Sequence, residues 1–217
     1  MWAKLNIDVS NRCCNIDKAL VNLSNYHDVS SHGAVTNPKI RRKMDKKLQN
    51  STEQMIGRFG SFASHMLTLT MNDKTNWNLS ETAVKQAIKY FVVSLNFRMW
   101  GHASRKDKTR AKSQIIAIPV CEGLKSQKRV HVHMLLGNIP DAEIPALEAT
   151  ILEIWRKTSI GLERMCLDPL HDLDGAVFYL AKEVGYINND AVDWETASIP
   201  SVLYTPPKPQ PGQRVTA

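Results

Sequence analysis

Several features that define large protein classes are missing from this sequence of 217 residues. No window approaches the roughly 18 uninterrupted apolar residues of a membrane span, and the first residues lack the apolar core of a signal peptide. The sequence also lacks the Gly-x-x-x-x-Gly-Lys-Ser/Thr loop that cradles nucleotide phosphates. We therefore expect a cytoplasmic protein with no membrane span and no P-loop domain.

Cysteine is scarce as well. The chain has four: Cys13, Cys14, Cys121 and Cys166. They are too scattered for a disulfide framework, and the adjacent pair lacks the Cys-x-x-Cys spacing of many metal sites. We expect reduced thiols with no metal-binding role.

What the sequence does contain is typical of a folded, basic protein. Hydrophobic residues make up 43% and charged residues 23%, which disfavours wholesale disorder and collagen-like repetition. Lys and Arg number 28 against 21 Asp and Glu, so the net charge is +7 and the pI is near 9.3. This balance favours polyanionic partners, with nucleic acid first and a membrane surface second.

Composition divides the chain into three parts. Residues 1–60 are polar and basic and read as an N-terminal extension, with helix expected around residues 38–58, where Pro38 sits near a helix start. Residues 61–190 carry regular hydrophobic periodicity and form the expected folded domain. Residues 191–217 are rich in proline, which removes backbone donors, and are expected to form a tail.

Periodicity predicts the first elements of the folded domain. Alternation over 65–71 predicts a strand, and helical spacing from Ser80, a good N-cap, predicts a helix to about residue 100. After a basic loop, apolar runs at 115–121 and 130–136, separated by a turn, predict an antiparallel hairpin.

The remaining elements complete a recognisable order. We expect a helix at 141–157, a short strand at 164–168, and a helix at 173–185 that ends on a glycine. The order β-α-β-β-α-β-α fits an α+β fold. It is the split βαβ arrangement of ferredoxin-like or RNA-recognition-motif proteins, an antiparallel sheet with helices on one face.

The tripeptide His131-Val132-His133 lies within the second hairpin strand. Residues two apart on a strand share a face, so both imidazoles can chelate one divalent metal. Glu122, at the end of the preceding strand, can add a carboxylate and leave coordination positions open. The alternative is that both histidines are structural, hydrogen-bonded in the core.

A second pair, Tyr179 and Lys182, lies on the last predicted helix. Three residues apart, the two side chains share a helix face, where a phenol can attack a metal-polarised phosphate and an ammonium can stabilise the charge. The alternative is an amphipathic helix on which Tyr179 packs and Lys182 is solvated.

Taken together and in this order, the motifs resemble the HUH endonucleases, in particular the rolling-circle replication initiator (Rep) group. The apolar strand Met66-Leu-Thr-Leu-Thr70 matches that family's first motif, His131-Val132-His133 its second and Tyr179-Leu-Ala-Lys182 its third. The similarity covers roughly residues 60–190. The motifs are short, so the resemblance rests on their order, spacing and expected secondary structure.

The resemblance implies a role for each of these residues. His131, His133 and Glu122 would bind Mg²⁺ or Mn²⁺, Tyr179 would be the nucleophile that forms a 5′-phosphotyrosine, and Lys182 would position the phosphate. The protein would nick and join single-stranded or hairpin origin DNA of a plasmid, phage or mobile element. Without a P-loop domain, unwinding and synthesis would fall to a separate helicase and polymerase.

Some assignments stay open at this point. Asp73 can replace Glu122 as third ligand, and Tyr186 can serve as a second nucleophile, although Asn189 stands where a matching lysine would be expected. A relaxase would use an N-terminal tyrosine, for which Tyr26 is the best candidate. The small transposases of the superfamily are shorter and lack the basic extension.

Basic residues flank the candidate site in the sequence and are expected to contact DNA phosphates. They are Arg105, Lys106, Lys108, Arg110, Lys112, Lys128 and Arg129. A non-catalytic nucleic-acid-binding module is a different reading, but the predicted strands lack the aromatic residues of RNA-recognition modules. A metal-dependent hydrolase of small substrates would leave both the basic charge and the Tyr-x-x-Lys helix unexplained.

Overall fold

The protein is represented by a computed structural model that describes residues 44–71, 79–125 and 129–203. Several residues considered above lie outside these ranges: Cys13, Cys14, Tyr26, Asp73 and Lys128. Within the described ranges, no helix has the length and apolar character needed to cross a membrane.

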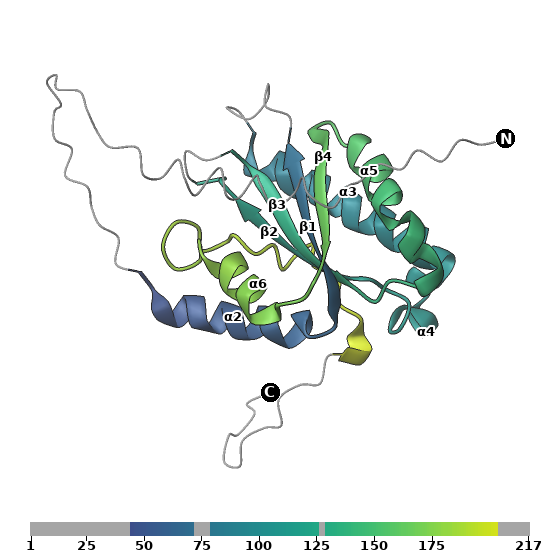
Figure 1. The fold of residues 1–217 in the computed structure, drawn as a ribbon, viewed down its shortest axis with the longest axis horizontal. Helices are drawn as coiled ribbons and strands as arrows, with labels where there is room; N and C mark the ends of the chain where they lie inside the picture. The colour runs from purple at the N-terminus through teal and green to yellow at the C-terminus, as the bar shows by residue number, and fades with distance from the viewer. Residues whose placement is uncertain (1–43, 72–78, 126–128, 204–217) are drawn as a thin grey trace, which may run out of the picture. The chain divides into compact units, whose positions relative to one another are not determined.

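The centre of the fold is a curled four-stranded antiparallel sheet (Figure 1). Its strands are β1 (Ala63–Met71), β2 (Ile116–Glu122), β3 (His131–Gly137) and β4 (Gly161–Pro169), in the spatial order β2-β3-β1-β4. Strands β2 and β3 form the predicted hairpin, and β1 pairs with both β3 and β4. The predicted α+β fold class is confirmed.

One face of the sheet is covered by α3 (Glu81–Trp100) and α5 (Leu147–Arg156). Helix α3 begins as predicted, because the Ser80 hydroxyl accepts a hydrogen bond from the Ala83 N–H at 3.1 Å. The segment before α5 is a 3₁₀ turn, η3 (Asp141–Ala146), that contains a proline, so the α-helix starts later than the periodicity indicated. The rings of Phe91 and Trp155 meet edge to face between these helices.

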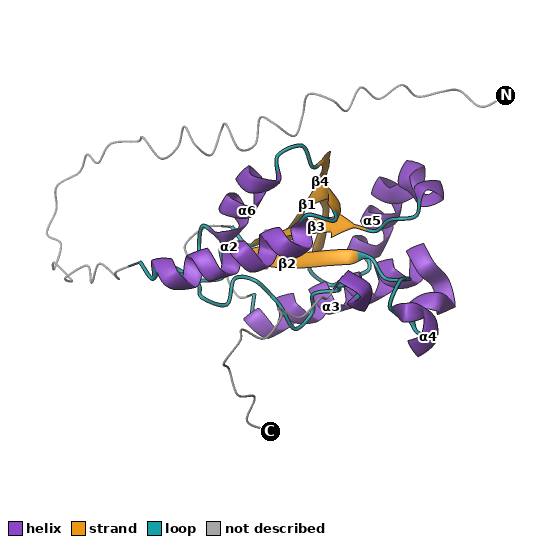
Figure 2. Cartoon of the chain, turned by 90° about the horizontal axis from the view of Figure 1, so that it is seen from below, coloured by secondary structure: helices purple, strands orange, loops and turns teal. Residues whose placement is uncertain are grey.

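The opposite face is covered by α2 (Lys46–Gly60) and α6 (Leu173–Ala181), so the expectation of helices on one face was incomplete. Figure 2 shows the sheet between α2 and α3. Ile56 and Phe59 of α2 pack with Leu135 of β3 and Val177 of α6. Strand β2 is buried along its whole length, and such unbroken apolar runs are typical of strands covered on both faces.

Helix α2 lies in the segment read from composition as an extension, yet it packs on the sheet. Asp45 caps it by accepting a hydrogen bond from the Leu48 N–H at 3.0 Å, and Pro38 lies outside the described residues. At the other end of the chain, the residues after α6 lie along the outer edge of β2. There Val192 pairs with Val120 and Ser198 with Ala117.

A buried polar network fixes that last segment to the sheet edge. The Asn96 side chain accepts from the Ile115 N–H at 2.9 Å and donates to the Val92 carbonyl and to the Ser198 hydroxyl. The Ser198 hydroxyl in turn donates to the Ile115 carbonyl at 2.9 Å. Every group in this network therefore has a partner inside the core.

We expect Asn96→Ala to lower the free energy of unfolding by about 2–3 kcal/mol, because the buried Ile115 N–H loses its acceptor. For a protein of this size the midpoint of thermal unfolding should fall by roughly 5–10 °C. Gln86→Ala, at an exposed position of the same helix, is the matched control and should change little. Equal midpoints for the two variants would show that the network contributes no stability.

Candidate metal centre

The hairpin register brings three candidate ligands together. Glu122, the last residue of β2, is paired with His131, the first residue of β3, and His133 is paired with Val120. Because side chains alternate along a strand, His131 and His133 both point to the face covered by α6, as does Glu122. The two-residue spacing of the histidines and the position of Glu122 thus have the consequence expected from the sequence.

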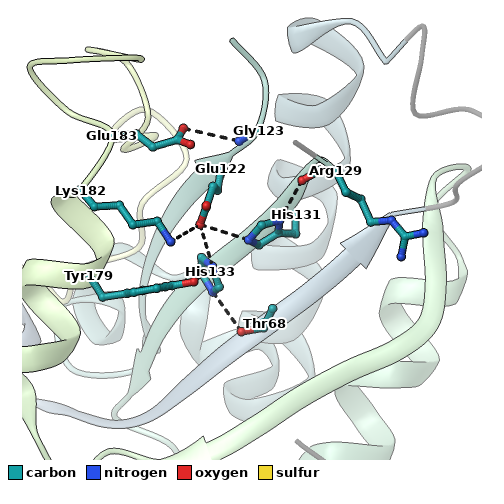
Figure 3. Close-up of polar contacts among 9 residues, drawn as sticks. All are labelled: Thr68, Glu122, Gly123, Arg129, His131, His133, Tyr179, Lys182 and Glu183. Atoms are coloured by element: carbon teal, nitrogen blue, oxygen red, sulfur yellow. Dashed lines mark hydrogen bonds and ion pairs between the residues drawn. The ribbon is translucent and has the colours of Figure 1, made fainter. Parts of the chain in front are cut away.

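The ligand atoms of these residues all lie within 4.8 Å of one another (Figure 3). One carboxylate oxygen, Glu122 Oε2, is 3.2 Å from His131 Nε2 and 3.3 Å from His133 Nε2. Glu122 and His133 are only 4% and 5% exposed, whereas His131 is half-buried and forms the side open to solvent. These three residues could hold a metal ion, and we call them the metal centre.

Hydrogen bonds behind the ligands orient both imidazole rings. His131 Nδ1 lies 2.9 Å from the Arg129 carbonyl oxygen, which can only accept, so Nδ1 donates there and Nε2 is the ring nitrogen that faces Glu122. His133 Nδ1 lies 3.0 Å from the Thr68 hydroxyl on the adjacent strand β1. Metal-binding histidines usually have such a partner on the nitrogen that does not face the metal.

The centre carries a buried negative charge. Burial alone raises the pKa of Glu122, but hydrogen bonds with His131, His133 and Lys182 outweigh it and hold that pKa well below its usual range. Burial also lowers the pKa of His133, although Glu122 partly opposes this effect. An ionised carboxylate beside imidazole nitrogens in a largely buried position is a donor set suited to a divalent cation.

Helix α6 places Tyr179 and Lys182 over the metal centre. The Tyr179 hydroxyl lies 3.2 Å from His133 Nε2, and the two rings meet edge to face. The Lys182 ammonium lies 2.5 Å from Glu122 Oε2 and 3.3 Å from the centre of the Tyr179 ring. Tyr179 and Lys182 therefore lie on the same side of α6, as predicted, and both point toward β3, the strand that carries the two histidines.

Contacts at both ends fix the position of α6. At its start, Asp172 accepts a hydrogen bond from the Gly175 N–H at 3.0 Å. Beyond its end, the buried Glu183 side chain accepts from the Gly123 N–H at 3.4 Å. Gly185 has a positive φ of 79°, and its carbonyl accepts from the Asp45 N–H before α2. The tyrosine is thus held by the sheet and by α2.

Other candidates are not brought to the metal centre. Arg105, Lys106, Lys108, Arg110 and Lys112 lie in or beside the short helix α4 (Asp107–Arg110), near the start of β2 and so at the opposite end of that strand from Glu122. Arg129 lends its carbonyl to His131, but its side chain points away from the centre (Figure 3). Tyr186 is half-exposed and lines a separate hollow with Asp45 and Lys125.

Three contributors were missed in the sequence: Thr68, the Arg129 carbonyl and Glu183. Thr68 left a signal, because it is a polar residue that alternates with Leu67 and Leu69 and so points to the opposite face of the strand. Which histidine it meets depends on the pairing of β1 with β3, which alternation does not specify. The carbonyl of Arg129 and the side chain of Glu183 left no signal of their own.

The arrangement provides two nitrogen ligands, one oxygen ligand, a phenol and an ammonium around one buried point. Two histidines and a carboxylate on one side of a cation leave its other positions open for substrate oxygens. The residues present therefore fit a divalent metal ion. Comparisons of the chain with protein-family models, curated proteins and solved structures return no match, so the function has to be argued from this geometry.

Proposed function

We propose that the protein is a metal-dependent enzyme that nicks and rejoins single-stranded DNA through a tyrosine, acting as a rolling-circle replication initiator. The observation that carries this proposal is the 3.2 Å contact between the Tyr179 hydroxyl and His133 Nε2, two groups separated by 46 residues in the chain. A tyrosine can attack a phosphate held at a metal centre only if its hydroxyl lies next to that centre. The motif order that resembles HUH initiators supports the same reaction.

Each residue has a role that follows from its contacts. His131, His133 and Glu122 would hold the metal, and Thr68 and the Arg129 carbonyl keep the two rings in the orientation described above. When bound, the metal supplies a Lewis acid that polarises a phosphate oxygen. Lys182, beside both Glu122 and Tyr179, provides positive charge for the oxygens of the phosphate under attack.

The reaction exchanges one phosphodiester for another. The Tyr179 phenol loses its proton to solvent, its oxygen forms a bond to phosphorus, and the bond from phosphorus to the 3′ oxygen breaks. The 3′ oxygen takes up a proton and leaves as a hydroxyl. Attack by a 3′ hydroxyl on the phosphotyrosine reverses these steps and rejoins the strand, so no nucleotide hydrolysis is needed.

The partner in this proposal is origin DNA, presented as a single strand or hairpin, with a separate helicase and polymerase for unwinding and synthesis. The net charge of +7 supports a polyanionic substrate. A noncatalytic module would not need a buried carboxylate and a phenol at a two-histidine centre.

The direct test is to incubate the protein with labelled single-stranded oligonucleotides tiled across its own replicon, with Mn²⁺ or with a chelator. We expect a protein-linked DNA band on a denaturing gel, present with Mn²⁺ and absent with the chelator. If a full tiling gave no adduct while the DNA still bound, the proposed chemistry would be wrong and a binding module would be favoured.

A further inference from the structure

Five exposed cationic side chains lie on one folded turn at the far end of the sheet from the metal centre. We call residues 105–112 the basic turn. Its cations are Arg105, Lys106, Lys108, Arg110 and Lys112, and Asp107 is the only acid among these eight residues. Nothing in the proposed nicking reaction uses these charges.

The basic turn is held in a defined shape by the residues around it. The Ser104 hydroxyl donates to the Gly101 carbonyl at 2.7 Å, and the Thr109 hydroxyl donates to the Ala103 carbonyl at 2.8 Å. The Arg105 guanidinium lies 4.5 Å from the centre of the Phe97 ring. Because the backbone is already ordered, binding a ligand costs less conformational entropy than it would in an open loop.

The length of β2 separates the basic turn from the metal centre. Ile116 opens the strand beside Gly137, and Glu122 closes it beside His131. Asn138, directly after Gly137, donates to the Lys112 carbonyl at 3.1 Å and so fixes the turn to the Gly137 end. With a rise of about 3.4 Å per residue, the two ends of β2 are roughly 20 Å apart. One phosphate cannot contact both.

A hollow of about 320 Å³ adjoins the basic turn. Lys112, Phe62 and Val202 line it, and Phe62 is 51% exposed. An accessible aromatic ring beside a lysine is the pairing with which proteins stack an unpaired base and hold its phosphate. The hollow thus adds a base-sized apolar contact to the charges of the turn.

We infer that the basic turn and the adjoining hollow form a second DNA-binding surface, which holds the phosphodiester backbone about 20 Å from the phosphate cut at the metal centre. This inference rests on the proposed function for its choice of polyanion. In duplex geometry, 20 Å corresponds to about six base pairs, so the surface holds DNA that flanks the nick.

The test measures DNA binding without cleavage, in chelator, so that its result does not depend on the nicking reaction. The triple variant Lys106→Ala, Lys108→Ala, Arg110→Ala is compared with Lys85→Ala, Lys89→Ala, Lys157→Ala, which removes the same charge from α3 and from the end of α5. The binding of each variant to labelled duplex DNA and to labelled single-stranded DNA is measured over a series of salt concentrations. We expect the slope of log K against log salt to fall by about 2 to 3 only for the basic-turn variant.

A second variant separates the two forms of DNA. Phe62→Ala removes the exposed ring, so we expect single-stranded DNA to bind about tenfold more weakly, with duplex binding unchanged. Equal slopes for the two triple variants would overturn the inference, because only net charge would then matter. If the basic-turn variant lost binding to anionic vesicles as strongly as it lost binding to DNA, the inference would also be overturned, in favour of a membrane surface.

Varying the length of DNA beyond the nick tests this inference separately from the proposed function. An oligonucleotide that ends within three nucleotides of the nick should be cut equally by wild type and basic-turn variant, whereas one that extends ten nucleotides or more should bind the variant less tightly. If no adduct forms with either DNA but the slope still changes, the binding surface stands and the nicking proposal fails.

Discussion

Replacing Tyr179 by phenylalanine is expected to abolish the covalent protein–DNA product. The substitution removes the hydroxyl that lies 3.2 Å from His133 Nε2 and leaves the ring, with its edge-to-face contact to His133 and its contact to the Lys182 ammonium, in place. Loss of a nucleophile typically costs about 10⁴-fold or more in rate, so adduct should fall below detection on a denaturing gel.

The matched control is Tyr186→Phe, the same change seven residues further along the chain. Tyr186 is half-exposed and lines a different hollow, so this variant should form adduct like the wild type. Adduct retained in Tyr179→Phe but lost in Tyr186→Phe would move the nucleophile to Tyr186. Adduct retained in both would exclude each of these two tyrosines as the sole attacking group.

His133→Ala is expected to weaken Mn²⁺ binding at least about 100-fold, as measured by calorimetric titration in the absence of DNA. Loss of an outer partner of a metal ligand usually costs 10- to 100-fold, and loss of the ligand itself should cost more. In wild type, free Mn²⁺ at 100 times its dissociation constant should add about 2.7 kcal/mol of stability, seen as a rise in the thermal midpoint. The variant should show no such rise at that concentration.

Two further variants test whether the loss of Mn²⁺ affinity depends on the position of the substituted residue. Thr68→Val removes the hydroxyl behind the His133 ring and should weaken Mn²⁺ binding by roughly tenfold, because the ring is then less well oriented. His171→Ala removes an exposed histidine distant from the ligands and should leave binding unchanged. Wild-type affinity in His133→Ala would show that the centre is structural rather than metal-binding.

Much of the fold followed from local patterns. Alternation located β1, the apolar runs located β2 and β3, and Ser80 marked the start of α3. The same patterns placed Glu122 across the hairpin from His131, because β2 and β3 are consecutive in the chain and the alternation of each strand determines which residues share a face. These features depend on neighbours close in sequence, which is why the sequence could predict them.

Other features depended on contacts between distant segments. Helix α2 has a polar composition, and only its packing on α6 and β3 reveals Ile56 and Phe59 as core residues. The residues around Ser198 were read as tail because prolines follow them, yet their partner, Asn96, lies 102 positions earlier. The basic turn flanks the candidate site in the sequence, but it lies at the other end of β2 from Glu122.

The candidate metal ligands lie close together in the sequence, whereas the candidate nucleophile lies far from them. Glu122 lies nine and eleven residues from the two histidines, so a single hairpin in register already contains every ligand. Tyr179 joins only after a further 46 residues have been placed, including α5 and β4. Short loops close at a lower entropic cost than long ones, so the hairpin can assemble before α6 docks. If the proposed function holds, the cation ligands would thus be in place during synthesis on the ribosome before the attacking tyrosine, which joins only when the C-terminal part of the fold is complete.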